Sequence, residues 1–154
     1  MTGASLVVET ASLRFRPDGP ATGNVWLVLN GQEFPMRGWN DFVVVILGWW
    51  AAALLLVLRN ESPHEMVEFM DGPYAVEVSR TLSGTLWFRA LEGPGRNSEV
   101  VIGEGLIKPF AVGLVAQSRE VLNACRRQGW WSEDAETLQS ALEDLEQELS
   151  RFLS

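Results

Sequence analysis

The chain has 154 residues, 47% of them hydrophobic and 21% charged, with a formal net charge of −8 at pH 7. This length fits one domain, and the composition is that of a folded globular protein, which excludes a disordered chain. The acidic charge argues against nucleic-acid binding, because carboxylates repel phosphates and Arg126-Arg127 is the only adjacent basic pair.

The amino-terminal part of the chain reads as a small antiparallel strand unit over residues 5–35. Apolar and polar residues alternate within 6–16, the period expected when one face of a sheet is buried. The segment Pro17-Asp18-Gly19-Pro20 then turns the chain, and residues 24–29 form a second strand candidate. Asn30-Gly31 follows it, a favoured hairpin turn pair.

Residues 42–58 form an unbroken apolar run that either crosses a bilayer or lies in a folded core. The run reaches only the lower limit for a membrane span, about 17 residues. Interfacial tryptophans belong at the ends of a span, whereas Trp49 and Trp50 lie in its middle. We therefore predict a buried helix over residues 40–60 and no membrane segment.

Residues at the ends and in the middle of this helix predict where it begins and ends and how closely it packs. Asn40 or Asp41 is expected to cap its first turn, and the end is expected near Arg59-Asn60. Gly48 inside a helix costs about 1 kcal/mol relative to alanine. We expect that this glycine allows another backbone to approach closely.

Four more strand candidates follow the helix and form a predicted meander over residues 65–103. Glycine- and proline-containing turns join them, and joints this short imply antiparallel neighbours. The candidates are residues 66–70, 74–79, 85–90 and 99–102. Together with the first unit they predict an antiparallel sheet of about five or six strands.

Two helices are predicted to close the chain, over residues 106–128 and 132–153. The second has a narrow apolar seam with steps of four and three, which covers one partner only. That partner is either the preceding helix or a second copy of the chain, so the seam also predicts a homodimer. Its residues are Leu138, Leu142, Leu145, Leu149 and Phe152.

The residues that could act in catalysis or bind a metal do not form a recognisable motif in the sequence. His64 is the only histidine and lies in a loop between Glu61 and Glu65, where it reads as a solvated residue. Cys125 falls on the apolar stripe of a helix, where a small buried hydrophobe is expected. We predict no catalytic residue, no metal site and no cofactor.

Two features predict contacts with a partner. The last helix region, residues 132–154, holds seven acidic side chains against Arg151 alone, and such a face suits a basic partner. The turn Asp71-Gly72-Pro73-Tyr74 reads either as a tight turn or as a contact loop that presents Asp71 and Tyr74. The acidic candidates are Glu133, Asp134, Glu136, Glu143, Asp144, Glu146 and Glu148.

Three short motifs in the central third of the chain also carry a resemblance. Residues 38–42 (GWNDF), 47–50 (LGWW) and 69–74 (FMDGPY) together resemble a group of small bacterial proteins of the polymorphic-toxin immunity type. The resemblance implies a cytosolic, acidic, single-domain inhibitor. Its motifs are structural and imply no catalytic residue.

These observations predict one α+β domain over residues 1–154, in which an antiparallel sheet is packed by the apolar helix and a carboxy-terminal helical hairpin. The leading hypothesis is a cytoplasmic, non-enzymatic binding protein for a basic partner, such as a toxin domain. The alternatives are a small-ligand protein or enzyme with a tryptophan-lined pocket reached near His64 or Tyr74, and a structural homodimer.

Overall fold

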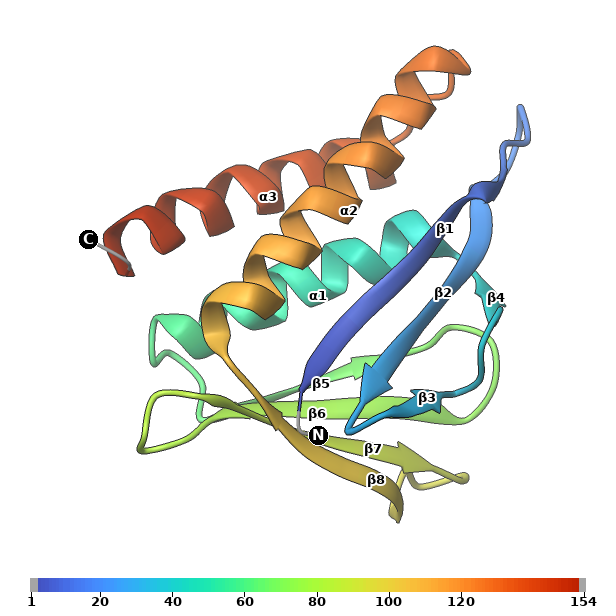
Figure 1. Cartoon of the computed structure of the whole chain (residues 1–154). Coiled ribbons are helices and arrows are strands. Elements are labelled where there is room, and N and C mark those ends of the chain that lie inside the picture. Colours follow the sequence, from blue (N-terminus) through green and yellow to red (C-terminus); the bar gives the residue numbers. More distant parts are fainter. Residues whose placement is uncertain (1–2, 153–154) are drawn as a thin grey trace.

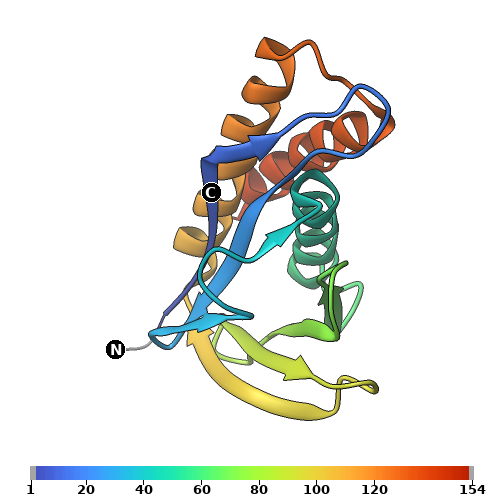
Figure 2. The same cartoon turned by 90° about the vertical axis from the view of Figure 1, so that its right-hand side faces the viewer.

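The computed structural model describes residues 3–152 and places its helices on one side and its sheets on the other (Figures 1 and 2). Helix α1 lies between the pair α2–α3 and the second of two sheets. The elements in chain order are β1 (Ala4–Arg14), β2 (Thr22–Leu29), β3 (Gln32–Phe34), β4 (Asn40–Asp41), α1 (Val43–Leu58), β5 (His64–Glu68), β6 (Tyr74–Arg80), β7 (Leu86–Glu92), β8 (Ser98–Gly105), α2 (Ile107–Arg127) and α3 (Glu133–Phe152).

The predicted α+β class is confirmed, but the strands form two antiparallel sheets of four instead of one sheet of five or six. The first sheet has the order β1-β2-β3, with the short β4 also paired to β2. The second is the predicted meander, β5-β6-β7-β8. Residues 5–35 and 65–103 therefore each build a sheet of their own.

The two sheets meet by packing at the end of β8. A Cβ added at Gly103 would lie 2.6 Å from Leu29 Cδ1, and one added at Gly105 would lie 3.1 Å from the Cβ of Ala4. The two glycines thus let β8 press against the ends of β1 and β2. The two sheets are in contact there, but the ladder of one does not continue into the other.

Helix α1 occupies the middle of the hydrophobic core, as the apolar run predicts. Twelve of its residues are buried, Trp50 among them at 0% exposure. It begins at Val43, later than predicted, and Asp41 does not cap it: the cap residue is Phe42, and among residues 3–152 no side chain caps the first turn by a hydrogen bond. Within residues 3–152, no helix has the length and apolarity to cross a bilayer.

Replacing Gly48 by alanine is expected to raise the free energy of unfolding by up to about 1 kcal/mol. The backbone that approaches Gly48 belongs to α3, since a Cβ added at Gly48 would lie 4.0 Å from Leu138 Cα. That separation is an ordinary van der Waals contact, so the helix gains propensity without a clash. The control is Gly103→Ala, whose Cβ meets Leu29 and which is expected to lower stability. Urea unfolding of both variants checks the prediction; a loss of stability in Gly48→Ala contradicts it.

The seam predicted on the last helix is buried inside the chain. The four leucines Leu138, Leu142, Leu145 and Leu149 are at most 7% exposed, and α3 contacts α1 and α2. A homodimer stays a prediction, but in this conformation the leucine seam proposed as its interface is already packed against α1 and α2. Phe152 is half-buried and stacks below the Arg80 guanidinium at 4.9 Å; the predicted helix end at 153 lies outside the described residues.

A side chain of α2 seals the free edge of β1. Gln117 Oε1 accepts a hydrogen bond from the Val8 backbone N–H at 2.5 Å, and Gln117 Nε2 donates to the Leu6 carbonyl oxygen. The side-chain amide thus bonds β1 as the peptide group of a further strand would. Because exposed edges recruit other strands, this contact protects the first sheet as well as anchoring α2 to it.

Candidate functional site

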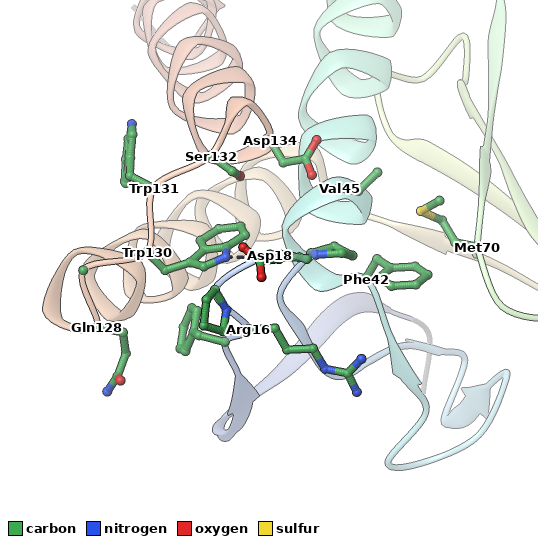
Figure 3. Close-up of a pocket in the computed structure, with 15 residues that line it drawn as sticks. Arg16, Asp18, Phe42, Val45, Met70, Gln128, Trp130, Trp131, Ser132 and Asp134 are labelled. Atoms are coloured by element: carbon green, nitrogen blue, oxygen red, sulfur yellow. Dashed lines mark hydrogen bonds between the residues drawn. The ribbon is translucent and has the colours of Figure 1, made fainter.

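A cleft lies where the β1–β2 connection, the start of α1 and the α2–α3 connection meet (Figure 3). Its volume is about 960 Å³, within the range of ligand and side-chain binding clefts. Residues 15–20 form one wall and residues 128–132 another, and Phe42, Val45, Met70 and Asp134 complete the lining. We call it the aromatic–acidic cleft.

Trp130 holds two walls of the cleft together. Its side chain is 9% exposed and packs against the Phe15 ring, with centroids 5.8 Å apart. Its Nε1–H donates to the carbonyl oxygen of Gly19 at 3.2 Å. Gly129, with φ of 65°, follows the end of α2 and turns the chain so that Trp130 faces the loop. The two connections, more than 100 residues apart in sequence, are thereby joined.

Trp131 forms an exposed aromatic surface at the rim. It is 40% exposed, and its Nε1–H donates to Glu136 Oε2 at 2.6 Å. The Arg126 guanidinium lies over the ring, 4.6 Å from its centroid. These two contacts restrict the indole, so the rim carries a rigid aromatic group that a partner can meet at low entropic cost.

The charged groups of the cleft are unpaired within the part of the chain that the structure describes. Asp18 is exposed on the loop and Asp134 is half-buried in the first turn of α3, and both carboxylates project toward the cleft (Figure 3). Among residues 3–152 neither forms an ion pair or a side-chain hydrogen bond, and Arg16 forms none either. Two carboxylates and one guanidinium leave the lining with a net negative charge.

A buried carboxylate fixes the floor beside the cleft. Asp41 is 3% exposed; its Oδ1 accepts the Phe42 N–H at 2.7 Å, and its Oδ2 accepts Trp39 Nε1–H at 2.9 Å and the Asp71 N–H at 3.1 Å. It therefore ties the start of α1 to the turn that follows Met70. The residue expected to cap a helix instead holds three segments in place around the cleft.

The predicted contact turn at 71–74 is mainly structural. Tyr74 is half-buried and packs edge-on against Phe34 at 5.7 Å and Trp39 at 5.2 Å. Gly72 has φ of 92°, a conformation that suits glycine in a tight turn. Asp71 is exposed, and a partner contact through Asp71 or Tyr74 stays a prediction.

The acidic residues predicted on α3 fall into three groups. Glu146 and Glu148 are engaged within the chain, Glu146 with Arg119 and Glu148 with Arg59 at 3.1 Å and with Arg151. Glu136 holds Trp131, and Asp134 enters the cleft. The exposed carboxylates without an ion pair among the described residues are Glu133, Glu143 and Asp144.

The aromatic–acidic cleft is not the tryptophan-lined pocket that one alternative placed near His64 or Tyr74, because neither of these residues lines it. His64 is exposed at the start of β5, and its carbonyl oxygen accepts the Ser62 hydroxyl at 2.6 Å. Among residues 3–152, no three His, Cys, Asp or Glu side chains are placed to hold a metal ion.

Cys125 is expected to resist alkylation. Burial raises the pKa of its thiol to about 11, so at pH 8 roughly one thiol in a thousand is ionised. Iodoacetamide labelling at pH 8 should be at least about 100-fold slower in the folded protein than in denaturant, since an unfolded thiol has a pKa of about 8.5. The rate should rise with pH toward 11. A folded-state rate within tenfold of the unfolded rate contradicts the burial.

Comparison of the chain with protein-family models, with curated proteins and with solved structures finds no match. The resemblance to immunity proteins therefore stays a prediction. What the protein does has to be argued from the aromatic–acidic cleft and the surface around it.

Proposed function

We propose that this protein binds a basic partner protein without catalysing a reaction, and that the aromatic–acidic cleft receives a cationic side chain of that partner. One observation carries the proposal: Asp18 and Asp134 line the cleft without an ion pair among residues 3–152, together with the aromatic side chains of Phe15, Phe42 and Trp130. Carboxylates beside aromatic rings are the groups that attract an ammonium or guanidinium.

The charge around the cleft supports the same class of partner. Glu133 lies next to Asp134, and Glu143 and Asp144 continue the acidic face of α3. The chain as a whole carries −8. A field of one sign raises the rate at which an oppositely charged protein associates and disfavours partners of like charge. Within the cleft, Arg16 is the single group that would select against a purely cationic surface.

The test is a quantitative capture experiment from native cells with paired variants. Asp18→Asn with Asp134→Asn removes two charges at the cleft, and Glu92→Gln with Glu120→Gln removes two exposed charges elsewhere. We expect a captured basic protein whose affinity, measured after purification, falls about tenfold or more in the cleft variant only. An equal loss of affinity in both variants, or an affinity that does not change in the cleft variant, would overturn the proposal.

An immunity-type role is the specific form of this proposal that the resemblance favours. The protein would then inhibit a basic toxin domain by occupying its surface. Co-expression of the protein with the captured partner should restore growth of cells that the partner alone arrests, and the cleft variant should fail to restore it. A partner that does not impair growth would leave binding in place and remove the immunity role.

Small-ligand binding is the second candidate, favoured by the volume of the cleft and its tryptophans. A ligand with a cationic group for Asp18 and an anionic group for Arg16 would suit it. Titration of Trp fluorescence with free arginine separates the candidates. Saturation at micromolar concentration, abolished in Asp18→Asn, favours a small ligand, whereas no saturation favours a protein partner.

A further inference from the structure

Helix α1 leaves one apolar stripe uncovered. Its buried residues face α2, α3 and the sheets, but Trp49 is 40% exposed, Ala52 is exposed, and Val45 and Leu56 are half-buried. These four residues are spaced by four, three and four positions, the spacing of a seam that packs against another helix. We call them the α1 stripe; it extends over about three helical turns.

Strand β5 extends this apolar surface. Met66 is 45% exposed and, with Trp49 and Ala52, lines a hollow of about 300 Å³ between α1 and β5. Glu65 and Glu68 form the rim of the hollow. Glu68 is paired with Arg96 at 2.8 Å, while the Glu65 carboxylate accepts the Ser62 hydroxyl at 2.8 Å and forms no ion pair among residues 3–152. The stripe therefore has an acidic border on its β5 side.

The α1 stripe is continuous with the aromatic–acidic cleft. Val45, its first residue, also lines the cleft, and Trp49 follows one turn later on the same side of α1. At that end Asp134 supplies a carboxylate from α3. A ligand that fills the cleft and continues along α1 would thus meet apolar groups in the middle, carboxylates at the borders and the guanidinium of Arg16 within the cleft.

We infer that the α1 stripe binds an amphipathic helix of the basic partner, with apolar residues on the stripe and lysines or arginines reaching Glu65 and Asp134. This inference rests on the proposed function and specifies the partner's structure. A helix with apolar residues every three or four positions matches the stripe, in the mode in which helices occupy apolar grooves. Flanking cations match the acidic border.

Charge decides against the two other occupants of an apolar face. A second copy of the chain would bring the same carboxylates, Glu65 and Asp134, toward this acidic surface and add a second charge of −8. An anionic lipid surface would be repelled in the same way. A basic helix is the occupant that both the apolar spacing and the charge favour.

The experiment uses the full chain and a fluorescent synthetic peptide of leucine and lysine, about 15 residues long, with leucines spaced by three and four. Binding is measured by fluorescence anisotropy. The controls are a scrambled peptide of the same composition and a peptide in which glutamate replaces lysine. The variants are Trp49→Ala and Ala52→Arg, and the matched control is Leu82→Ala, fully exposed in the turn between β6 and β7. Thermal unfolding verifies that each variant is folded.

We expect saturable binding of the leucine–lysine peptide, weakened about tenfold or more by each stripe variant and unchanged in Leu82→Ala. Equal binding of the scrambled or glutamate peptide, no binding at all, or indifference to both stripe variants would overturn the inference. So would a dimer in light scattering that Ala52→Arg dissociates. If the native partner's affinity depends on Asp18 and Asp134 but not on Trp49 or Ala52, the proposed function stands and this inference fails.

Discussion

Replacing Trp50 by alanine is expected to lower the free energy of unfolding by about 3–5 kcal/mol. The side chain is 0% exposed and joins three elements: its ring lies 6.3 Å from Phe88 in β7 and 5.5 Å from Phe110 in α2, between ring centroids. Phe88 and Phe110 are themselves 4.9 Å apart. Removing the indole leaves a cavity between α1, the second sheet and α2, which the neighbours can fill only in part.

The adjacent tryptophan supplies the matched control. Trp49 is 40% exposed on the same helix, so Trp49→Ala is expected to cost less than about 1 kcal/mol. Urea unfolding followed by circular dichroism measures both. Trp50→Phe should lose less than Trp50→Ala, because phenylalanine keeps most of the volume and removes an indole N–H that has no acceptor in the described chain. Equal losses for Trp49→Ala and Trp50→Ala would contradict the described orientation of α1.

Replacing Asp41 by alanine is expected to lower the free energy of unfolding by about 2–4 kcal/mol. The carboxylate is 3% exposed, and its loss leaves the Trp39 indole N–H and the Asp71 backbone N–H without their acceptor. Both hydrogen bonds are part-buried, and an unpaired polar group that water cannot reach freely is costly. Asp41→Asn keeps one acceptor oxygen and should lose about half as much.

A local measurement separates the role of Asp41 from general destabilisation. Amide hydrogen exchange at Asp71 should accelerate in Asp41→Ala more than exchange in the middle of α1, because the carboxylate holds the turn beside the cleft. Asp71→Ala is the control: its side chain is exposed and should change stability by less than about 0.5 kcal/mol. Uniform acceleration across the chain would show that Asp41 does not act on the turn.

Local patterns predicted most of the elements, and for a physical reason. Alternation in 6–16, the turn pair Asn30-Gly31 and the leucine seam of the last helix each depend on neighbours within a few residues. The helices predicted at 106–128 and 132–153 are found at Ile107–Arg127 and Glu133–Phe152. These elements could be predicted because a helix or strand that is buried on one side needs apolar residues at a fixed spacing along the chain.

The cleft was not predicted, because its walls are distant in sequence. Residues 15–20 read as a chain-breaking turn, and Trp130-Trp131 lay between two helix predictions without a partner. The signal that could have drawn attention to them is a pair of tryptophans beside a short loop, since large aromatic groups outside regular elements need a surface to cover. Asp18 and Arg16 gave no signal of their own, because a charged residue in a turn is ordinarily solvated.

The sequence by itself determined the α+β class, the order of the elements and the place of residues 42–58 in the core. These features depend on the spacing of apolar residues and on turn residues, both of which are local in the sequence. Only the tertiary structure decided that there are two sheets, that Trp50 is buried while Trp49 is exposed, and that Asp18 and Asp134 face one cleft. An apolar run does not show which side of a helix will be buried, because every side of it is equally hydrophobic. The packing of α2, α3 and the sheets selects the buried sides, and the remaining α1 stripe is what a partner can reach.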